Sequence, residues 1–305
     1  MRSFLVKQQD RRRKRRGEEE LKSIAQQRAV GLALELERRL LEETAPGVNR
    51  TLEHELIISL TSFQQRLDNV HLTIESLMRQ TVKASRIILN IAANDFSPQT
   101  IPDSLKLQQK RGLEIAFIEE DLGPYTKYFY TLKNHPESLI LTVDDDIMYP
   151  IDLVAKLYAA YRHEPDVIHC LRAHRILRND QGQLLPYKQW NFNTSHCTAG
   201  FDIFPTGVGG VLYFPGCFAE EIFNKELFLE LAPGADDVWL KAMSLKKGVR
   251  CKKLADVRSW TLRFPLIPDS QVVSLKRKNK QKQGGNNEKI ARVFDHFNLR
   301  DKIFD

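Results

Sequence analysis

Apolar and polar positions follow two periods along this chain, one typical of buried strands and one typical of helices. Short apolar runs predict four core strands, at 55–60 (ELIISL), 86–91 (RIILNI), 113–118 (LEIAFI) and 139–143 (LILTV). Between and after them, residues 68–80, 125–134 and 151–163 have apolar side chains at helical spacing. Strands that alternate with helices at this interval favour βαβ units and a largely parallel sheet, so the predicted fold class is α/β.

The two ends of the chain depart from this pattern. Residues 18–43 place apolar side chains at mixed helical spacings among many Glu and Arg, which predicts a surface-facing helix ended by TAPGVN. Beyond a short strand expected at 167–171, a long irregular region is rich in aromatic residues and glycine. Near the C-terminus, GGNNEKIARVFDHF predicts a short helix with one apolar face, formed by Ile290, Val293, Phe294 and Phe297.

Composition sets the class of protein. The 305 residues are 42% hydrophobic and 28% charged, which suits a globular protein with a sizeable core. No apolar run approaches the roughly 18 residues that span a bilayer, and no apolar segment follows the basic start as it would in a secretory signal. The cysteines stand far apart without a CxxC pair, which disfavours a zinc site or a disulfide scaffold and favours a cytoplasmic location; they are Cys170, Cys197, Cys217 and Cys251.

The net charge of +7 is unevenly distributed. Residues 1–50 hold 13 Lys and Arg against 8 Asp and Glu, and basic runs occur at 11–16 (RRRKRR) and 276–282 (KRKNKQK). Such runs either attract an anionic surface, such as the inner face of the cell membrane, or are solvated tails. No aromatic residues interleave with the charges to stack on bases, and no zinc-finger or RNP pattern occurs, so no nucleic-acid partner is expected.

The candidate chemistry centres on three aspartates that follow the fourth strand in LILTVDDDIMYP. Asp144, Asp145 and Asp146 repel one another, and such a cluster usually persists where a cation binds. The outer two form a DxD pattern, and Mg²⁺ or Mn²⁺ commonly takes one or two carboxylates plus substrate phosphates. Ligands of open α/β sheets collect at this end of the strands. The alternative is an acidic turn that caps the helix expected from about Ile151.

A second acidic pair, Asp236 and Asp237, precedes the helical segment VWLKAM. Either carboxylate is a candidate base for deprotonating a hydroxyl group. The alternative is a pair that caps the helix start, and both interpretations can hold together.

Several segments in order resemble a known family. ELIISLTSF, SLMRQT at 76–81 and RIILNIAANDF resemble the opening of GT-A glycosyltransferases, particularly the large family 2. Together with TVDDDIMYP, RAHR, GVGGVLYFP and APGADDVW, they make the chain, from about 56 to 260, similar to bacterial sugar transferases of surface-polysaccharide and lipopolysaccharide pathways. This chain has AANDF where family 2 usually carries DDGS, so Asp95 is only a weak candidate for contacting the nucleobase or ribose.

The resemblance implies a GT-A (Rossmann-like) fold, with a mixed, mainly parallel sheet flanked by helices. It divides the chain into a basic helical extension (1–50), a catalytic domain (51–275) and a basic linker with a short helix (276–305). The implied reaction is the metal-dependent, inverting transfer of a sugar from a nucleotide-sugar donor to a glycan or lipid-linked acceptor. A metal-dependent phosphohydrolase or nucleotidyltransferase is the alternative enzyme class.

Roles follow for individual residues. Asp144 and Asp146 are expected to hold Mn²⁺ or Mg²⁺, and Asp237 or Asp236 to act as the base. The donor contacts are expected from Asp144, Asp145, Asp95, Lys127 and Arg66. Lys127 would neutralise a phosphate, although a lone lysine is more often solvated.

The acceptor candidates come from the irregular region and the segment after it. Gly209 and Gly210 would let backbone approach a sugar closely, or they belong to a plain loop. Arg172 and His174 would bind phosphate or an acidic acceptor, or form a surface basic cluster. Trp239 would stack on a sugar ring or lie in the core. The donor sugar and the nucleobase depend on loop geometry that motif spacing does not determine.

Overall fold

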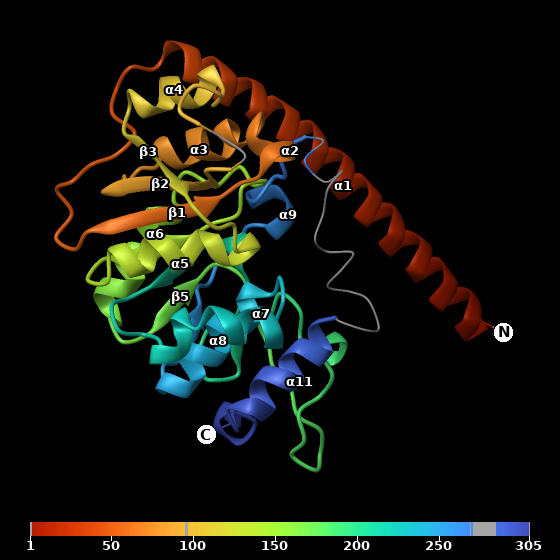
Figure 1. Cartoon of the computed structure of the whole chain (residues 1–305). Coiled ribbons are helices and arrows are strands. Elements are labelled where there is room, and N and C mark those ends of the chain that lie inside the picture. Colours follow the sequence, from red (N-terminus) through yellow and green to blue (C-terminus); the bar gives the residue numbers. More distant parts are fainter. Residues whose placement is uncertain (1, 95–96, 269, 271–284, 305) are drawn as a thin grey trace.

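A seven-stranded mixed sheet forms the centre of the molecule (Figure 1). The computed structural model describes residues 2–94, 97–268, 270 and 285–304, so Asp95 and the basic run at 276–282 lie outside the described residues. The strand order is β3-β2-β1-β4-β8-β5-β9. The strands are β1 (Leu56–Thr61), β2 (Arg86–Ala92), β3 (Leu113–Ile118), β4 (Leu139–Thr142), β5 (Ile168–Cys170), β8 (Val211–Tyr213) and β9 (Cys251–Lys253).

The sheet is parallel except around β8, which runs antiparallel to both of its neighbours. The pairs β1–β2, β1–β4, β2–β3 and β5–β9 are all parallel. The predicted fold class, α/β with a mixed and mainly parallel sheet, is therefore confirmed. A separate two-stranded ribbon pairs β6 (Ala173–Arg175) with β7 (Ile203–Pro205).

Both faces of the sheet are covered, which explains the continuous apolar runs of its strands. In β1, Ile58 packs into the core on one face and Ile57 into the core on the other. Helices α3 (Val70–Met78), α4 (Asp103–Gln109) and α6 (Leu153–His163) contribute to the first core. Helices α5 (Thr126–Asn134), α7 (Lys225–Leu231), α8 (Asp236–Lys247) and α11 (Asn286–His296) contribute to the second.

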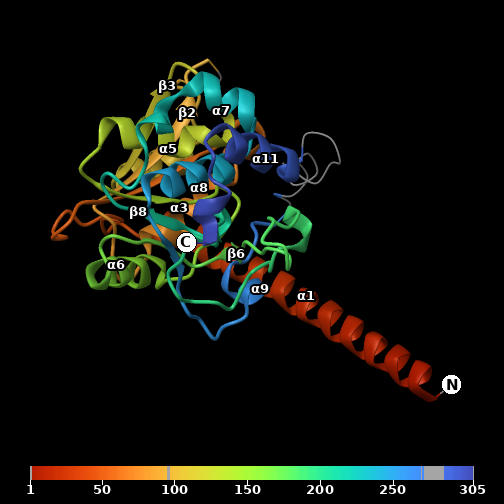
Figure 2. The same cartoon turned by 90° about the horizontal axis from the view of Figure 1, so that it is seen from below.

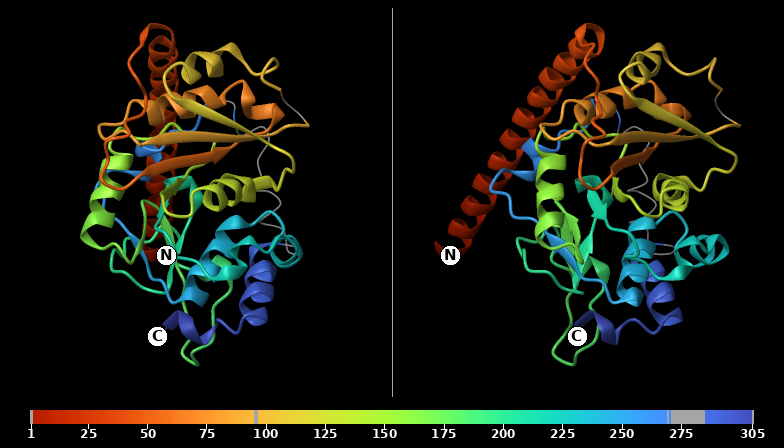
Figure 3. Two further views of the ribbon diagram at one scale, coloured as in Figure 1. Left: turned by 60° about the vertical axis from the view of Figure 1, so that its left-hand side comes forward. Right: turned by 90° about the vertical axis from the view of Figure 1, so that its left-hand side faces the viewer.

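Shorter elements complete the chain: α2 (Gln64–Leu67), α9 (Trp260–Arg263), and the 3₁₀ turns η1 (Gly123–Tyr125), η2 (Tyr187–Gln189), η3 (Gly207–Gly209), η4 (Glu220–Phe223) and η6 (Asp301–Phe304). The apolar face predicted for the C-terminal helix is present, because Ile290, Val293 and Phe294 are buried in α11. In both views of Figure 3 this helix lies at the opposite end of the molecule from the point where α1 leads into β1.

Helix α1 (Arg2–Glu42) begins earlier than the sequence predicts. Its N-terminal part extends away from the body of the molecule (Figures 1 and 2), and residues 16–20 are exposed. Its C-terminal part is not purely surface-facing, because Leu36 and Leu40 are buried. Leu36 packs in a cluster with Leu72, Met148 and Ile267. The mixed apolar spacing of this helix therefore reflects two different environments along its length.

A buried ion pair connects α3 with the segment that follows α4. Arg111 Nη1 lies 2.8 Å from Glu75 Oε2, and the two side chains are 5% and 0% exposed. Without Arg111, the buried Glu75 carboxylate keeps only the more distant Arg39, whose Nε lies 3.8 Å from Glu75 Oε1. Arg111→Met is therefore expected to lower the free energy of unfolding by about 3 kcal/mol in urea titration. Arg38→Met is the matched control, because the Arg38–Glu42 pair is more than half exposed and such pairs contribute at most about 1 kcal/mol. If the two variants lost the same free energy of unfolding, the buried Arg111–Glu75 pair would not be the more important one for stability.

Candidate active site

The three aspartates lie in a turn at the carboxyl end of β4. The strand itself ends at Thr142, and Asp145 and Asp146 belong to a turn rather than to extended chain. The capping alternative fails, because the N-cap of α6 is Asp152, several residues further on. Asp144 is anchored through its backbone N–H, which donates to the Tyr149 hydroxyl at 2.9 Å. The cluster therefore occupies the expected edge of the sheet without serving the next helix.

Lys127 connects this cluster to the second acidic pair. It lies in the first turn of α5, and its side chain is only 7% exposed. Its Nζ is 2.9 Å from Asp144 Oδ1 and 2.8 Å from Asp236 Oδ2. The structure thus brings together two acidic groups that are about 90 residues apart in the sequence. Lys127 is a buried ion-pair bridge, not the solvated lysine of the alternative interpretation.

Asp236 and Asp237 are the first two residues of α8, whose N-cap is Ala235 without a side-chain cap. Carboxylates are favoured at this end of a helix by its dipole. Asp236 is buried against Lys127, whereas Asp237 is partly exposed and accepts a hydrogen bond from the backbone N–H of Gly207 at 3.0 Å. Asp237 is therefore the member of the pair that a substrate can reach.

Gly207 permits the close packing at this point. A Cβ atom there would lie 2.8 Å from Lys127 Nζ and 3.3 Å from Asp237 Oδ1. Any side chain would consequently disturb the ion pairs or displace the Gly207 N–H from Asp237. Gly207 is the first glycine of the GVGG segment. The sequence predicts Gly209 and Gly210 of this segment as acceptor contacts, and it does not single out Gly207.

Burial and mutual repulsion raise the pKa values of Asp236 and Asp237. Burial, together with the charge of Asp236, raises the pKa of Asp237 to about 7, although Lys127 and the Gly207 N–H act in the opposite direction. Burial also raises the pKa of Asp236, against the effect of Lys127. Burial alone would lower the pKa of Lys127, but Asp144, Asp236 and Asp237 together raise it well above its usual value. A carboxylate with a pKa near neutrality suits proton transfer at neutral pH.

Arg66 faces the other two aspartates of the turn. Its Nη1 is 2.6 Å from Asp145 Oδ1 and 3.2 Å from Asp146 Oδ2. Asp145 is 8% exposed, and its second oxygen accepts from Ser62 Oγ at 2.7 Å. With both oxygens bonded to protein groups, Asp145 suits anchoring the turn, and its expected contact with the donor stays a prediction.

The residues present fit a divalent cation only if a substrate completes its shell. Within the described ranges, no group of three or more His, Cys, Asp and Glu side chains could hold a metal ion by itself. Asp144 and Asp146 are two partly exposed carboxylates, 31% and 14% exposed, at one turn. Mg²⁺ and Mn²⁺ sites of this kind use one or two carboxylates and take their remaining ligands from phosphates and water.

Two residues expected to contact the acceptor lie in the core, and a third, Gly210, packs against α6, so that its contact stays a prediction. Trp239 is fully buried, and its indole N–H donates to the Ile222 carbonyl, so it is a core residue. His174 is 2% exposed beside Phe192, and burial lowers its pKa to about 4, so it is a neutral core group. Gly210 has φ +76, and a Cβ there would meet Leu153 rather than open space.

Two further residues expected to contact the acceptor, Arg172 and Gly209, lie close to Gly207. Arg172 donates from Nη1 to Thr206 Oγ1 at 2.8 Å, next to Gly207. A Cβ at Gly209 would lie 2.6 Å from Arg172 Cβ, so Gly209 allows close backbone packing against that residue. Sequence reasoning missed Ser62, Thr206 and Tyr149, because single hydroxyl residues carry no pattern that distinguishes them.

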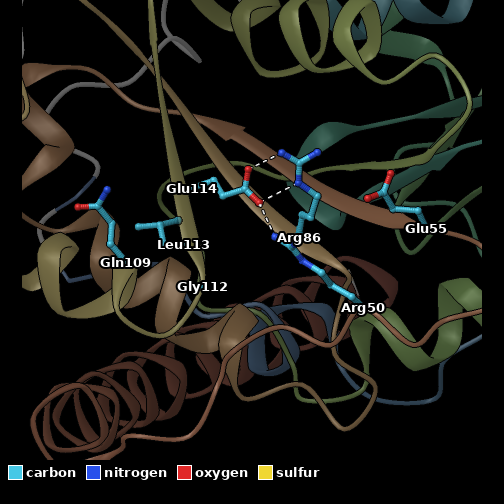
Figure 4. Close-up of a pocket in the computed structure, with 7 residues that line it drawn as sticks. All are labelled: Arg50, Glu55, Arg86, Gln109, Gly112, Leu113 and Glu114. Carbon is cyan, nitrogen blue, oxygen red and sulfur yellow. Dashed lines mark hydrogen bonds and ion pairs between the residues drawn. The ribbon is translucent and has the colours of Figure 1, made fainter.

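The pocket in Figure 4 is a different feature, at the opposite end of the strands. It has a volume of about 360 Å³ and lies where β2 and β3 begin. Its charged groups have partners: Glu114 contacts Arg86 and lies 3.6 Å from Arg50, and Glu55 accepts a hydrogen bond from Ser138 Oγ at 2.5 Å. Because these charges have partners, we assign the pocket no ligand.

Comparisons with known proteins give only distant likenesses. No protein-family model matches the sequence, and a search of curated proteins gives no match. Among solved structures, S. aureus TarS (residues 1–349) is 14% identical with a TM-score of 0.44, covering 66% of this chain and 58% of that one. The mannosyltransferase PcManGT from Pyrobaculum calidifontis, in complex with GDP-Man and Mn²⁺, is 14% identical with a TM-score of 0.43, covering 78% and 67%.

A third structure, of 4-diphosphocytidyl-2C-methyl-D-erythritol synthase, is 13% identical with a TM-score of 0.42, covering 68% of this chain and 91% of that one. Of the TarS fragment, this chain covers 58%, little more than half of its length. Likenesses at this level do not determine an activity, so the function has to follow from the geometry of the site.

Proposed function

We propose that this chain is a glycosyltransferase that moves a sugar from a nucleotide-sugar donor to a glycan or lipid-linked acceptor, with inversion and with the help of a divalent cation. The observation that carries the proposal is the meeting of two acidic groups at one sheet edge. Asp144 and Asp236 share Lys127, and Asp237 beside them has a pKa raised to about 7. The aspartates that follow β4 suit a cation that binds the diphosphate of a donor, and Asp237 suits a base.

In this mechanism Asp237 accepts the proton of an acceptor hydroxyl. The hydroxyl oxygen then bonds to the anomeric carbon of the donor sugar. The bond from that carbon to the diphosphate oxygen breaks, and its electron pair leaves with the nucleoside diphosphate. Gly207 orients the Asp237 carboxylate through its N–H, and Lys127 keeps Asp236 in place beside it.

Asp144 and Asp146 would hold the cation together with the donor phosphates. When bound, the cation supplies positive charge that stabilises the departing diphosphate. Arg66 positions Asp146 and Asp145, so the turn keeps its shape when one carboxylate exchanges partners.

A thermal-shift screen of nucleotide sugars with Mn²⁺ tests the donor class. A ligand that binds only the folded protein raises its apparent stability by an amount set by its concentration and Kd. At least one nucleotide sugar is expected to raise the melting temperature with Mn²⁺ present and to lose this effect in EDTA. Stabilisation by nucleoside triphosphates but by no nucleotide sugar would instead favour a nucleotidyltransferase.

The N-terminal extension suggests where the acceptor is presented. Within the described residues, no helix is both long enough and apolar enough to cross a membrane. The basic run at 11–16 lies in the part of α1 that extends from the body (Figure 2). We propose that it holds the enzyme against anionic lipid at the inner face of the cell membrane, each basic residue contributing about 1 kcal/mol.

Vesicle sedimentation tests this membrane contact. The full chain is expected to bind vesicles containing phosphatidylserine at low salt and to dissociate as salt rises, because the attraction is screened within about 10 Å at 0.1 M salt. Deleting residues 1–17 should abolish this binding. The same deletion should leave nucleotide-sugar stabilisation unchanged, since the site lies far downstream. If the full-length chain does not bind anionic vesicles at low salt, the membrane contact is wrong and the basic run at 11–16 is a solvated tail.

A further inference from the structure

Among the described residues, the guanidinium of Arg172 beside the acidic pair has no carboxylate partner. Within the described ranges, the buried Nε atom of Arg172 has no hydrogen-bond partner, and its Nη1 donates to Thr206 Oγ1. In the part of the chain that the structure describes, no carboxylate oxygen lies within 4.0 Å of its nitrogens. A guanidinium has five N–H donors, so most of those on Arg172 have no partner among the residues that the structure describes. Burial lowers the pKa of this group, and the charge of Asp237 only partly offsets that effect.

Arg172 is held in a fixed place against an aromatic ring. Its guanidinium carbon lies 5.1 Å from the ring centroid of Trp260, the first residue of α9. Arg263 lies near the same ring, at 5.9 Å, but it pairs with Asp256 at 2.5 Å. The two cations on one indole therefore differ, because one is neutralised by a carboxylate and the other is not.

Arg172 adjoins the segment that holds the Asp237 carboxylate, the proposed base. The Arg172 carbonyl accepts a hydrogen bond from the Thr206 N–H at 3.1 Å. Gly207, which follows Thr206, donates its N–H to Asp237. A hydroxyl that gives its proton to Asp237 brings its neighbouring substituents toward Arg172. Charge-assisted and bidentate bonds to carboxylate or phosphate are the contacts for which a held guanidinium is best suited.

We propose that Arg172 binds an anionic group of the acceptor, a carboxylate or a phosphate, close to the hydroxyl that attacks the donor. This inference rests on the proposed function, because it takes Asp237 as the base. It defines the acceptor class as an acidic glycan or a phosphate-bearing one, rather than a neutral sugar.

Ligand-observed NMR with small probes tests the inference before the acceptor is known. The probes are sodium glucuronate, inorganic phosphate and glucose, and glucuronate and phosphate distinguish the two sources of charge. At least one anion is expected to bind about tenfold more tightly than glucose, since hydrogen bonds to charged groups are the stronger class. Arg172→Met should remove this preference, and Arg172→Lys should keep part of it.

Arg178→Met is the matched control, because the Arg178 guanidinium also lies over an aromatic ring, 4.9 Å from the centroid of Phe304, and is exposed. It should leave the anion preference intact. Wild-type protein without any preference for either anion would overturn the inference, as would anion binding that survives Arg172→Met in a folded protein.

Competition with UDP or GDP separates this inference from the proposed function. Displacement of the anion by either nucleotide would place it in the donor site and overturn the acceptor assignment. An intact anion preference with no binding of any nucleotide sugar would instead contradict the proposed function.

Discussion

Asp237→Asn is expected to slow sugar transfer by roughly 10²–10⁴-fold while donor affinity stays nearly unchanged. Asparagine keeps the size of the side chain and can still accept the Gly207 hydrogen bond, but it cannot take a proton. The measurement is a comparison of kcat and of donor Kd in wild type and variant. An unchanged kcat in a folded variant would make Asp237 a structural residue of the α8 start.

Asp236→Asn is the companion variant. Asp236 is buried against Lys127, so its loss should affect donor binding and stability as well as turnover. Asp237 alone is expected to control the acidic side of the pH–rate profile. Because its pKa is raised to about 7, the base is protonated below that pH, and the rate should fall tenfold per pH unit there. In Asp237→Asn this limb should disappear.

Asp144→Ala and Asp146→Ala are expected to lower kcat/KM by about 10²-fold or more and to remove the effect of divalent cations on nucleotide binding. The charge that a metal places on a phosphoryl oxygen is worth several kcal/mol, and each 1.36 kcal/mol corresponds to a factor of ten. The measurement is titration of a nucleoside diphosphate with Mn²⁺ and with EDTA.

Asp166→Ala is the control for this pair, since Asp166 is an exposed aspartate that precedes β5 and lies outside the acidic cluster. It should behave as wild type. Nucleotide binding that is equal in EDTA, in Asp144→Ala and in Asp146→Ala would rule out the metal role of the turn.

Periodicity predicted the central sheet well, because strands buried on both faces have continuous apolar runs. The bounds of β3 match the prediction, and those of β1, β2 and β4 lie within one residue of it. Strands β8 and β9 were not predicted, because the three residues of each, Val211–Tyr213 and Cys251–Lys253, carry too little pattern. The packing of the second half of α1 was also missed, since exposed and buried leucines alternate there with many charges.

The site was predictable only as far as short motifs reach. The acidic groups at 144–146 and 236–237 stand out as local patterns, and the structure brings Asp144 and Asp236 to the same lysine. Nothing local to Lys127 shows that its partners include a residue 109 positions away. Trp239 and His174 could not be assigned from sequence, because an aromatic side chain has the same local pattern in a core and in a binding site.

The most direct test of the proposed reaction is the bond that breaks when a nucleotide sugar is turned over in ¹⁸O-labelled water without an acceptor. A glycosyltransferase breaks the bond between the anomeric carbon and oxygen during its slow hydrolysis. The expected product is therefore an intact nucleoside diphosphate whose phosphates carry no ¹⁸O by mass spectrometry. Release of nucleoside monophosphate or sugar phosphate with ¹⁸O on phosphorus would show phosphoryl chemistry instead, and would contradict sugar transfer at this site.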